Sequence, residues 1–511
     1  MARCTAHRQT LVEYRPSGVN HGGNHGSGQQ LVLKGVNGAL CPPEKAFRLR
    51  RALELVSRTM PETSEHLSNP QPRARWMRLD TAQLLKRFFF CERSLVVSEA
   101  SWIPAIASLD VKIGLARFIW QSAETADALR NRVFELRFPS RLLEEQGADN
   151  ALIQLFSAVK DSPSVPAFLI GVGKVLLPAL RDSYRAYMES SDSIADGPTH
   201  RFLSLALSEK KEQISTFEKW GNDALEQNSE LREGALNWAQ AIANRLLEVG
   251  GVGVGPASPA AGDGRLPGSK TYVIPERPAR DPRFWACRFY WPDVVDPNYP
   301  YGEGVQLQLR SAISHLNEVW AIEVGGVMLS AFADVLPWEW IHNAARWTYD
   351  ESRHCRMGYE RLMAWGFDIA EIPLGTYIYD SASGEDPIYC LGMLFFFETK
   401  NIKHKPARAK LFHTYGDTLS EHDMDFDWAD ETMHAGYGKH WLKELLAARG
   451  EDPAAYDQVR ERCEKLVRDY VGTATGHEVA DIKKVADALL VKAEQVLKVG
   501  ADIPPARLPA R

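Results

Sequence analysis

The sequence predicts an all-α protein with two helical bundles, of which the C-terminal one is a four-helix bundle with extra C-terminal helices. Three observations predict this fold. Apolar residues recur at helical spacing in long segments of both halves, and almost no segment shows the alternation of a strand. A run rich in Gly and Pro separates the two halves. The length of 511 residues also exceeds what one ordinary core accommodates.

Composition and charge are those of a globular protein with a small partner. The chain is 45% hydrophobic and 25% charged, with a formal net charge of −6, which argues against nucleic acid and anionic membranes as partners. The longest apolar runs are too short to cross a bilayer. The seven cysteines include no CxxC pair. We therefore expect a protein of the reducing cytoplasm.

The N-terminal half is expected to consist of an arm, a bundle and a linker. Residues 1–75 lack periodicity, which indicates an irregular or mobile arm; a metal-binding tail built on His7, His21 and His25 is the alternative. Residues 76–248 are expected to form the N-terminal bundle, with helices over 84–107, 111–136, 165–188 and 200–225 and another ending near 247. The Gly/Pro-rich residues 249–275 are expected to link the two domains.

The C-terminal half begins with a segment rich in Pro and aromatic residues. This segment, 276–305, is expected to be an ordered strap that packs on one of the bundles. Periodicity then predicts the second bundle over 306–446, with helices at 306–332, 337–364, 387–403 and 407–446. Residues 447–511 are expected to add two helices, at 453–471 and 477–498, and a Pro-rich tail.

Two copies of an Asp-Glu-x-x-His motif carry the strongest chemical signal, at 350–354 and 430–434. In each copy Glu and His are three residues apart, so on a helix they project from one face. A bundle that turned both faces inward would bury four ionisable groups at high cost unless a cation compensated them. The motifs therefore predict a metal site that contains Glu351, His354, Glu431 and His434. A third Glu-x-x-His, at 339–342, is interpreted as a chance occurrence.

Four-helix bundles that bind two metal ions also use one lone Glu from each of the other two helices. Glu398, which precedes Glu431, is the single acid of an apolar helix. Glu318 precedes Glu351 by the same interval that separates Glu398 from Glu431, so both helix pairs can place their acids at matching depth. Glu323 is the alternative ligand in the first helix. Because five residues correspond to about 140° around a helix, we do not expect both to bind one cluster, and Glu318 is preferred.

Residues beside these ligands are expected to orient them. A metal-bound His keeps its other nitrogen protonated, and a carboxylate of the neighbouring motif can accept that proton in a hydrogen bond. We therefore predict two crossed pairs, Asp350 with His434 and Asp430 with His354; solvated helix acids are the alternative. Arg353 is expected to hold these acids or to cap the bundle. Tyr437 is expected to pack in the core beside the site, with pocket lining or electron relay as alternatives.

The 350–354 motif resembles the DExRH signature of bacterial multicomponent monooxygenase hydroxylases, which are ferritin-like di-iron proteins. Residues 306–446 are more similar to a bacterial ferritin-like family that is described only as a domain of unknown function and is grouped near the tRNA-hydroxylating di-iron enzymes. That family shows H-x-E-L-Q-A-I-D, E-E-A-R-H, E-A-R-G-L-D-V-T-P and D-E-I-G-H-V-A-I-G segments. The matching segments here are 318–323, 350–354, 398–406 and 430–438. The chain departs from the pattern at His315, three rather than two residues before the Glu.

The resemblance implies a ferritin-like bundle with six ligands, namely Glu318, Glu351, His354, Glu398, Glu431 and His434. Four carboxylates and two imidazoles suit two iron ions, with manganese as the alternative. We expect an oxygenase or oxidase that uses O₂ as co-substrate to hydroxylate or oxidise a small organic molecule. Its further expected partner is an electron donor or reductase, and a homodimer is the candidate assembly. The alternatives are a non-catalytic or ferroxidase-type iron-binding protein and a helical interaction scaffold.

The N-terminal bundle is interpreted as a degenerate ferritin-like repeat without metal. The interval from Glu92 to Glu124 is close to the one that separates the paired acids of the second bundle. However, Asp127 stands three residues after Glu124, where the motifs have His, and Glu212 likewise follows Glu209. Because both imidazoles are missing, we expect a scaffold or docking role for this bundle.

Overall fold

The structure, a computed structural model, describes residues 73–256 and 265–500, with side chains to 496. Most of these residues are helical and very few are in strands, so the prediction of an all-α fold is confirmed. The strands among them are two residues long: β1 (Trp285–Ala286) pairs in parallel with β2 (Pro373–Leu374). The expected N-terminal arm, with His7, His21 and His25, lies outside the described residues except for 73–75. The C-terminal tail beyond 500 lies outside them as well.

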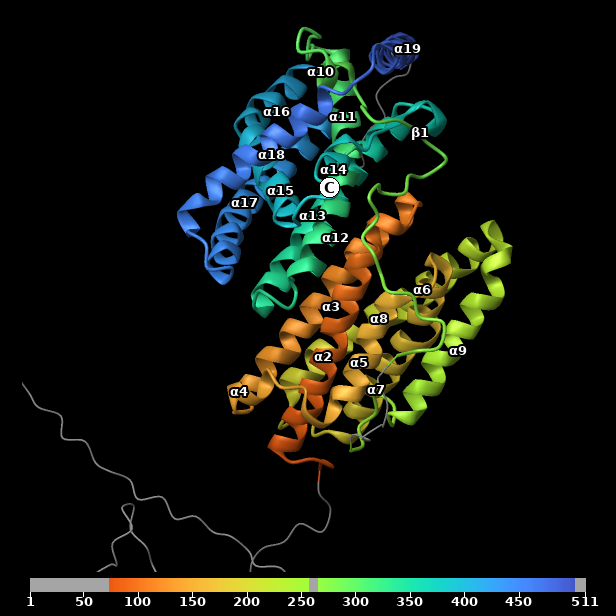
Figure 1. The fold of residues 1–511 in the computed structure, drawn as a ribbon, viewed down its shortest axis with the longest axis vertical. Helices are drawn as coiled ribbons and strands as arrows, with labels where there is room; N and C mark the ends of the chain where they lie inside the picture. The colour runs from red at the N-terminus through yellow and green to blue at the C-terminus, as the bar shows by residue number, and fades with distance from the viewer. Residues whose placement is uncertain (1–72, 257–264, 501–511) are drawn as a thin grey trace, which may run out of the picture. The chain divides into compact units, whose positions relative to one another are not determined.

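Long helices form the N-terminal half, as the periodicity predicts (Figure 1). Ser108 starts one of them by accepting a hydrogen bond from the Val111 amide, and Ser164 starts another in the same way. The predicted helix 165–188 is interrupted by a π-helical segment at Val172–Leu176. The helices are α2 (Arg78–Trp102), α3 (Leu109–Glu135), α4 (Ser140–Leu143), α5 (Asn150–Ala158), α6 (Val165–Gly171), α7 (Leu177–Ser190), α8 (Gly197–Gln227) and α9 (Arg232–Glu248).

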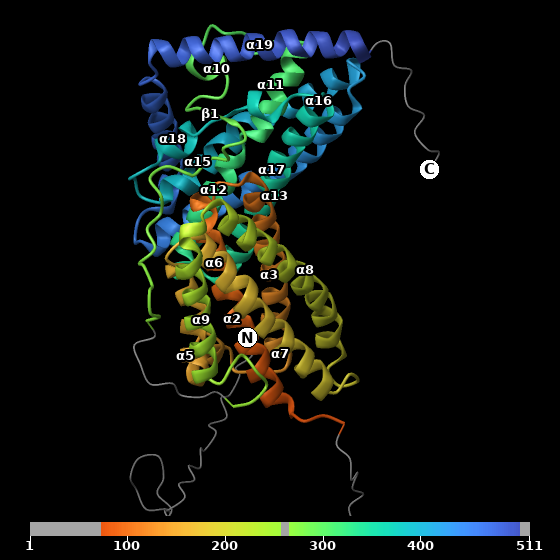
Figure 2. The same cartoon turned by 90° about the vertical axis from the view of Figure 1, so that its right-hand side faces the viewer.

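The described C-terminal half contains more helices than the periodicity predicts, because two of the predicted ones are broken and two short helices, over 292–295 and 377–381, were not predicted. The segment 306–332 forms two helices, and 407–446 is divided near Gly416, whose φ of +69° favours glycine. The helices are α10 (Pro292–Val295), α11 (Val305–Leu316), α12 (Val319–Phe332), α13 (Trp338–Ala364), α14 (Tyr377–Ser381), α15 (Ile388–Asn401), α16 (Lys405–Thr414), α17 (Thr418–Ala448), α18 (Tyr456–Val471) and α19 (Gly476–Gly500). Figure 2 shows α19 lying across α10 and α11, which it contacts.

The break between α11 and α12 is fixed by Asn317. Its amide nitrogen donates to the carbonyls of Ile313 and Pro373, both at 2.9 Å, and its oxygen accepts from the Gly375 amide at 2.7 Å. A side chain that bonds the neighbouring backbone in this way competes with helix continuation. The break therefore ties the start of α12 to β2 and places Glu318 at the helix N-terminus.

The two helical halves share one hydrophobic core within a single compact unit. Helix α2 contacts α12, and α3 contacts α13. A buried ion triad joins the halves: Glu323 of α12 pairs with Lys112 of α3 and with Arg280, which precedes β1. The strap also contributes to this packing, since the Ala279 carbonyl accepts from Lys112 at 2.9 Å. None of the described helices combines the length and the apolar character that crossing a membrane requires.

Candidate metal centre

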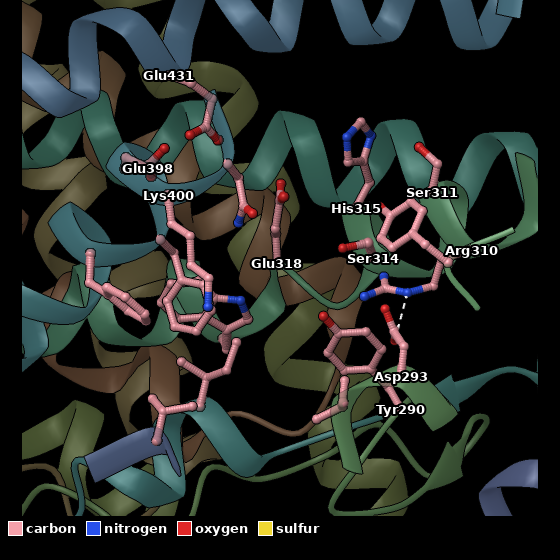
Figure 3. Close-up of a pocket in the computed structure, with 18 of the residues that line it drawn as sticks. Tyr290, Asp293, Arg310, Ser311, Ser314, His315, Glu318, Glu398, Lys400 and Glu431 are labelled. Atoms are coloured by element: carbon pink, nitrogen blue, oxygen red, sulfur yellow. Dashed lines mark hydrogen bonds and ion pairs between the residues drawn. The ribbon is translucent and has the colours of Figure 1, made fainter. Parts of the chain in front are cut away.

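Six side chains that the sequence singles out converge at one buried place. Four helices supply them, α12, α13, α15 and α17, and Figure 3 shows three of the carboxylates gathered there. The ring centroids of His354 and His434 lie 6.0 Å apart, and both side chains are fully buried. The remaining members, of which only Glu318 is partly exposed, are Glu318, Glu351, Glu398 and Glu431.

Each histidine presents its Nδ1 atom to the carboxylates. His354 Nδ1 lies 3.4 Å from Glu318 and 3.5 Å from Glu351. His434 Nδ1 lies 3.3 Å from Glu351 and 3.9 Å from Glu398. Glu351 therefore directs one oxygen to each ring, which places it between the two histidines. Trp347 fixes it there by donating from Nε1 to Glu351 Oε1 at 3.0 Å.

The donor atoms form two groups of metal-binding size. One group is Glu318, His354, Asp427 and Glu431; the other is Glu351, Glu398, Glu431 and His434. In each group the ligand atoms lie within 4.8 Å of one another, and Glu431 belongs to both. A carboxylate shared between two groups is what a pair of neighbouring metal ions requires.

Four buried atoms of this cluster have no hydrogen-bond partner: Nδ1 of both histidines, Glu318 Oε2 and Glu398 Oε2. Buried polar atoms are almost always satisfied, because an unmade hydrogen bond costs about 1–3 kcal/mol. Here the four atoms belong to residue types that bind iron, manganese and zinc, and they face one another. The residues present therefore fit a di-metal centre.

The crossed pairs predicted from the two motifs are present. His354 Nε2 lies 3.3 Å from Asp430 Oδ2, and His434 Nε2 lies 3.3 Å from Asp350 Oδ2. Two arginines hold these acids: Arg346 donates to Asp350 at 2.7 Å, and Arg353 pairs with Asp350 and, at 3.0 Å, with Asp430. Each imidazole thus has its outer nitrogen against a carboxylate, which leaves Nδ1 facing the cluster.

Asp427 belongs to the cluster and was not predicted from the sequence. It is fully buried, lies 3.5 Å from His354 Nδ1, and pairs with Lys405 at 2.6 Å. Lys405 also lies 3.1 Å from Glu431. The spacing of Asp427, Glu431 and His434 at four and then three residues is that of one helix face, and this signal was available in the sequence.

His315 lies behind Asp427 and does not belong to either donor group. Its Nε2 is 3.2 Å from Asp427, while Nδ1 is 2.6 Å from Arg361. Burial, followed by the charge of Arg361, lowers the pKa of His315, so this ring is neutral near pH 7. Its role is therefore to support Asp427.

The carboxylates and imidazoles strongly affect one another's protonation. Burial opposes protonation of His434, but the adjacent carboxylates of Asp350 and Glu351 outweigh burial and raise its pKa to about 9. Burial would raise the pKa of Glu351, but the two adjacent imidazoles lower it to about 2. Burial and the charge of Glu351 raise the pKa of Glu431. A metal ion would have to displace these protons, so metal affinity should increase with pH.

Glu323 and Tyr437, which the sequence also singles out, lie outside the two donor groups. Glu323, the alternative ligand, is fully buried but pairs with Lys112 and Arg280 and belongs to neither donor group. The structure therefore separates Glu323 from the candidate centre. The Tyr437 ring stacks on His434 with 6.4 Å between centroids, and its hydroxyl donates to the Met433 sulfur at 3.3 Å.

In the N-terminal half, a buried lysine has the role beside the acids that a metal cation would otherwise have. Lys210 donates to Glu92 at 2.8 Å and to Ser122 at 2.9 Å, and Tyr184 donates to Glu92 at 2.6 Å. Glu92 is thereby satisfied without a metal. No group of potential metal ligands occurs among the described residues of 76–248.

A cavity of about 450 Å³ adjoins the candidate centre and includes five of its carboxylates in its lining, Glu318, Glu351, Glu398, Asp427 and Glu431. Its other walls come from the strap and from α11, α12, α14, α15, α16, α17 and α18. This volume is typical of pockets that enclose small organic ligands.

Comparison with known proteins yields one match. A family model described as "Protein of unknown function (DUF455)" matches residues 272–480. No curated protein matches the chain, and no solved structure does. The matched segment contains the strap, every residue of the candidate centre and α18, and it leaves α2 to α9 outside. The chain is thus similar, over this segment, to a family of unknown function.

Proposed function

We propose that residues 306–446 form a ferritin-like four-helix bundle that holds two iron ions, and that the protein is an oxygenase or oxidase of a small organic substrate. The observation that carries the proposal is the set of four buried, unpartnered donor atoms on His354, His434, Glu318 and Glu398. Manganese in one or both positions is the alternative, because the same hard ligands suit it.

The ligands divide into two sets. Glu318 and His354 would hold one ion, Glu398 and His434 would hold the other, and Glu351 and Glu431 would lie between them. When bound, such a pair supplies electrons to O₂. Hydroxylation of a C–H bond consumes O₂, two electrons and two protons and yields an alcohol and one water, so an external reductant is required.

The other residues of the site orient the ligands and limit solvent access. Asp350 and Asp430 hold the outer nitrogens of the two imidazoles, and Arg353 holds both acids. Trp347 fixes Glu351. Preorganised ligands of this kind bind metal more tightly and with a defined geometry.

The cavity favours an enzyme over an iron-storage protein. Ferroxidation alone needs only a path for ions, whereas a cavity of about 450 Å³ beside the carboxylates can hold an organic molecule. The reducing cytoplasm is the compartment we propose. Five buried or partly buried cysteines in the described part of the chain are free thiols, Cys91, Cys287, Cys355, Cys390 and Cys463.

Metal content tests the proposed centre. Metal-free protein titrated anaerobically with Fe(II) should bind two ions per chain and change its optical spectrum when O₂ is admitted. The double variant His354→Ala/His434→Ala should lose both effects. His342→Ala is the matched control, since His342 lies on the same helix but is partly exposed and pairs with Glu124. Equal iron binding by the double variant and the control would contradict the centre.

Turnover tests the activity. With a chemical reductant, O₂ and an oxidisable organic compound, the iron-loaded protein should form more product than the iron supplied. Oxidation of Fe(II) without any organic product would instead support the ferroxidase alternative. A protein that binds no iron would support the interaction scaffold.

A further inference from the structure

The cavity beside the candidate metal centre has a charge pattern that changes along its length. Figure 3 shows Glu318, Glu398 and Glu431 toward one end and Arg310, Asp293 and Tyr290 toward the other. The cavity lining also contains six charged residues that are neither donor-group residues nor their neighbours Lys405 and His315. The four cations are Arg310, Lys400, Arg408 and Arg468, and the two acids are Asp293 and Glu464.

Arg310 is the buried cation of this second end. Its side chain is only 8% exposed, and its Nε donates to Asp293 at 2.9 Å. Its Nη1 atom is buried and has no hydrogen-bond partner among the described residues. The guanidinium also faces the rings of Tyr290 and Tyr301, at 5.5 and 5.0 Å. A buried guanidinium with an unused donor is a binding site for an anionic oxygen.

Three further cations line the same cavity without a carboxylate partner in the described part of the chain. Lys400 lies over the Phe396 ring at 5.1 Å, and Arg408 over the Tyr301 ring at 4.5 Å. Arg468 lies on α18. Cations that line a cavity and are not neutralised by acids attract anions and disfavour cations.

The cavity between these cations and the metal ligands has aromatic walls. Trp320, Tyr377, Phe396 and Phe397 contribute to them. Arg310 lies six residues before the end of α11 at Leu316, which corresponds to roughly 9 Å of helix rise, and Glu318 follows the break at the start of α12. A ligand that touches both ends therefore needs an apolar body about as long as a medium-chain alkyl group.

We propose that this cavity binds an organic anion, whose carboxylate or phosphate is bound by Arg310 and Arg408, which both contact the Tyr301 ring, and whose apolar body extends toward the metal ligands. The assignment of this anion as the substrate rests on the proposed function, whereas the binding itself does not. Arg310 is thus a specificity-determining residue, since it fixes which end of the molecule reaches the carboxylates.

Binding of matched probes to the metal-free protein tests the proposal. Octanoate, octyl phosphate, 1-octanol and octylamine share one alkyl chain and differ in the head group. Calorimetry should show saturable binding of octanoate or octyl phosphate, and at least tenfold weaker binding of the alcohol and the amine. A preference between the two anions tells a carboxylate from a phosphate ligand. Equal affinity for 1-octanol or octylamine would overturn the proposal.

Single substitutions distinguish the loss of a cavity cation from a general effect on folding. Arg408→Gln should weaken binding of the preferred anion at least threefold and leave 1-octanol unchanged. Lys410→Gln is the matched control, because Lys410 is exposed on the same helix as Arg408 and does not line the cavity. Arg310→Lys keeps the charge but loses the planar fork, and should cost about tenfold. Unchanged anion affinity in both cavity variants would overturn the proposal.

Iron binding by the same preparations distinguishes the two proposals. Anion binding without iron binding would refute the di-iron function and leave the anion site in place. Iron binding with no preference for the anionic probes would refute the anion site and leave the di-iron function in place.

Discussion

Glu99 is a buried acid in α2 with one carboxylate oxygen that has no hydrogen-bond partner. Burial raises its pKa from 4.5 to about 8, against the opposing charge of Lys210. The folded protein therefore keeps this proton up to about pH 8, whereas the unfolded chain loses it above about 4.5. Its contribution to stability is largest below pH 4.5 and declines as the pH rises toward 8.

Glu99→Gln should remove this pH dependence, because the amide cannot ionise. We expect the stability of the unmodified protein, relative to the variant, to fall by up to roughly 1.4 kcal/mol per pH unit between pH 5 and 8. Urea unfolding of both proteins at several pH values measures the difference. Parallel stability curves would show that Glu99 is not protonated in the folded protein.

Asp350→Asn tests the residues that orient the ligands. Asp350 accepts from Arg346 and lies against His434, so its loss should leave that imidazole without a fixed outer partner. We expect a loss of about 10- to 100-fold in metal affinity with little change in far-UV circular dichroism. Asp425→Asn, exposed on the same helix as the ligand Glu431, should bind metal normally. Equal affinities of the two variants would contradict the orienting role.

At the same scale, the sequence identified the Glu and His residues of the candidate centre better than their neighbours. Glu351, His354, Glu431 and His434 were predictable because Glu and His at three-residue spacing have a specific meaning on a helix. Asp427 shares the helix face of Glu431 and His434 but was not predicted, because it is one of six acids in residues 421–431 and stands outside the Glu-x-x-His motif. Lys405 was missed as well, because a lysine next to a proline after an apolar helix gives no signal of burial.

Close contact between α11 and α13 determines where Glu318 and Glu351 meet. Gly358 of α13 lies against the backbone of α11, so that an added Cβ would overlap the Leu316 amide nitrogen and the Ala312 carbonyl oxygen. Both are backbone atoms, which cannot move aside as the end of a flexible side chain can. The two helices would therefore have to move apart.

Gly358→Ala is therefore expected to destabilise the protein by about 1–3 kcal/mol and to weaken metal binding. Gly436→Ala is the control: an added Cβ there meets nothing within 4 Å, so the gain in helix propensity should stabilise by about 0.5–1 kcal/mol. Thermal unfolding of the two variants measures both effects. A stabilising effect of Gly358→Ala would show that the helices are not in close contact.

Element boundaries were predictable where the signal is local. Helix α13 matches its prediction closely. The break at Gly416 also has a local cause, a glycine with positive φ, but one helix was predicted across it. The break after α11 depends instead on hydrogen bonds from Asn317 to Pro373 and Gly375, which lie beyond α12 and α13 in the chain. Apolar periodicity continues through this break, so the sequence alone predicted one helix where there are two.

In the whole molecule, the triad of Lys112, Glu323 and Arg280 joins the helical halves. Glu323→Gln would leave two cations buried without their acid, which should cost about 3–5 kcal/mol. Glu339→Gln is the matched control, since Glu339 also pairs across the halves, with Arg130, but is 56% exposed and should cost less than about 1 kcal/mol. Denaturant unfolding measures both changes. Equal small losses would show that the triad does not hold the halves together.

The division of the chain into two domains remains a prediction, since the sequence suggested it from the Gly/Pro-rich residues 249–275. The described helices on either side share one core, and α2 and α3 contact α12 and α13 directly. Such long-range packing does not alter the local periodicity of apolar residues. The sequence therefore did not predict the shared core.

The position of Glu323 has a consequence for any protein that contains only the counterpart of residues 272–480. Such a protein would retain Glu323 and Arg280 but not Lys112, and the surfaces of α12 and α13 that α2 and α3 cover here would face solvent. To fold, it would need polar substitutions on those surfaces or a separate subunit that replaces the missing helices. The acid at the position of Glu323 should then be replaced wherever the segment with Lys112 is missing, and this replacement would distinguish proteins that contain only the matched segment from proteins that also contain α2 to α9.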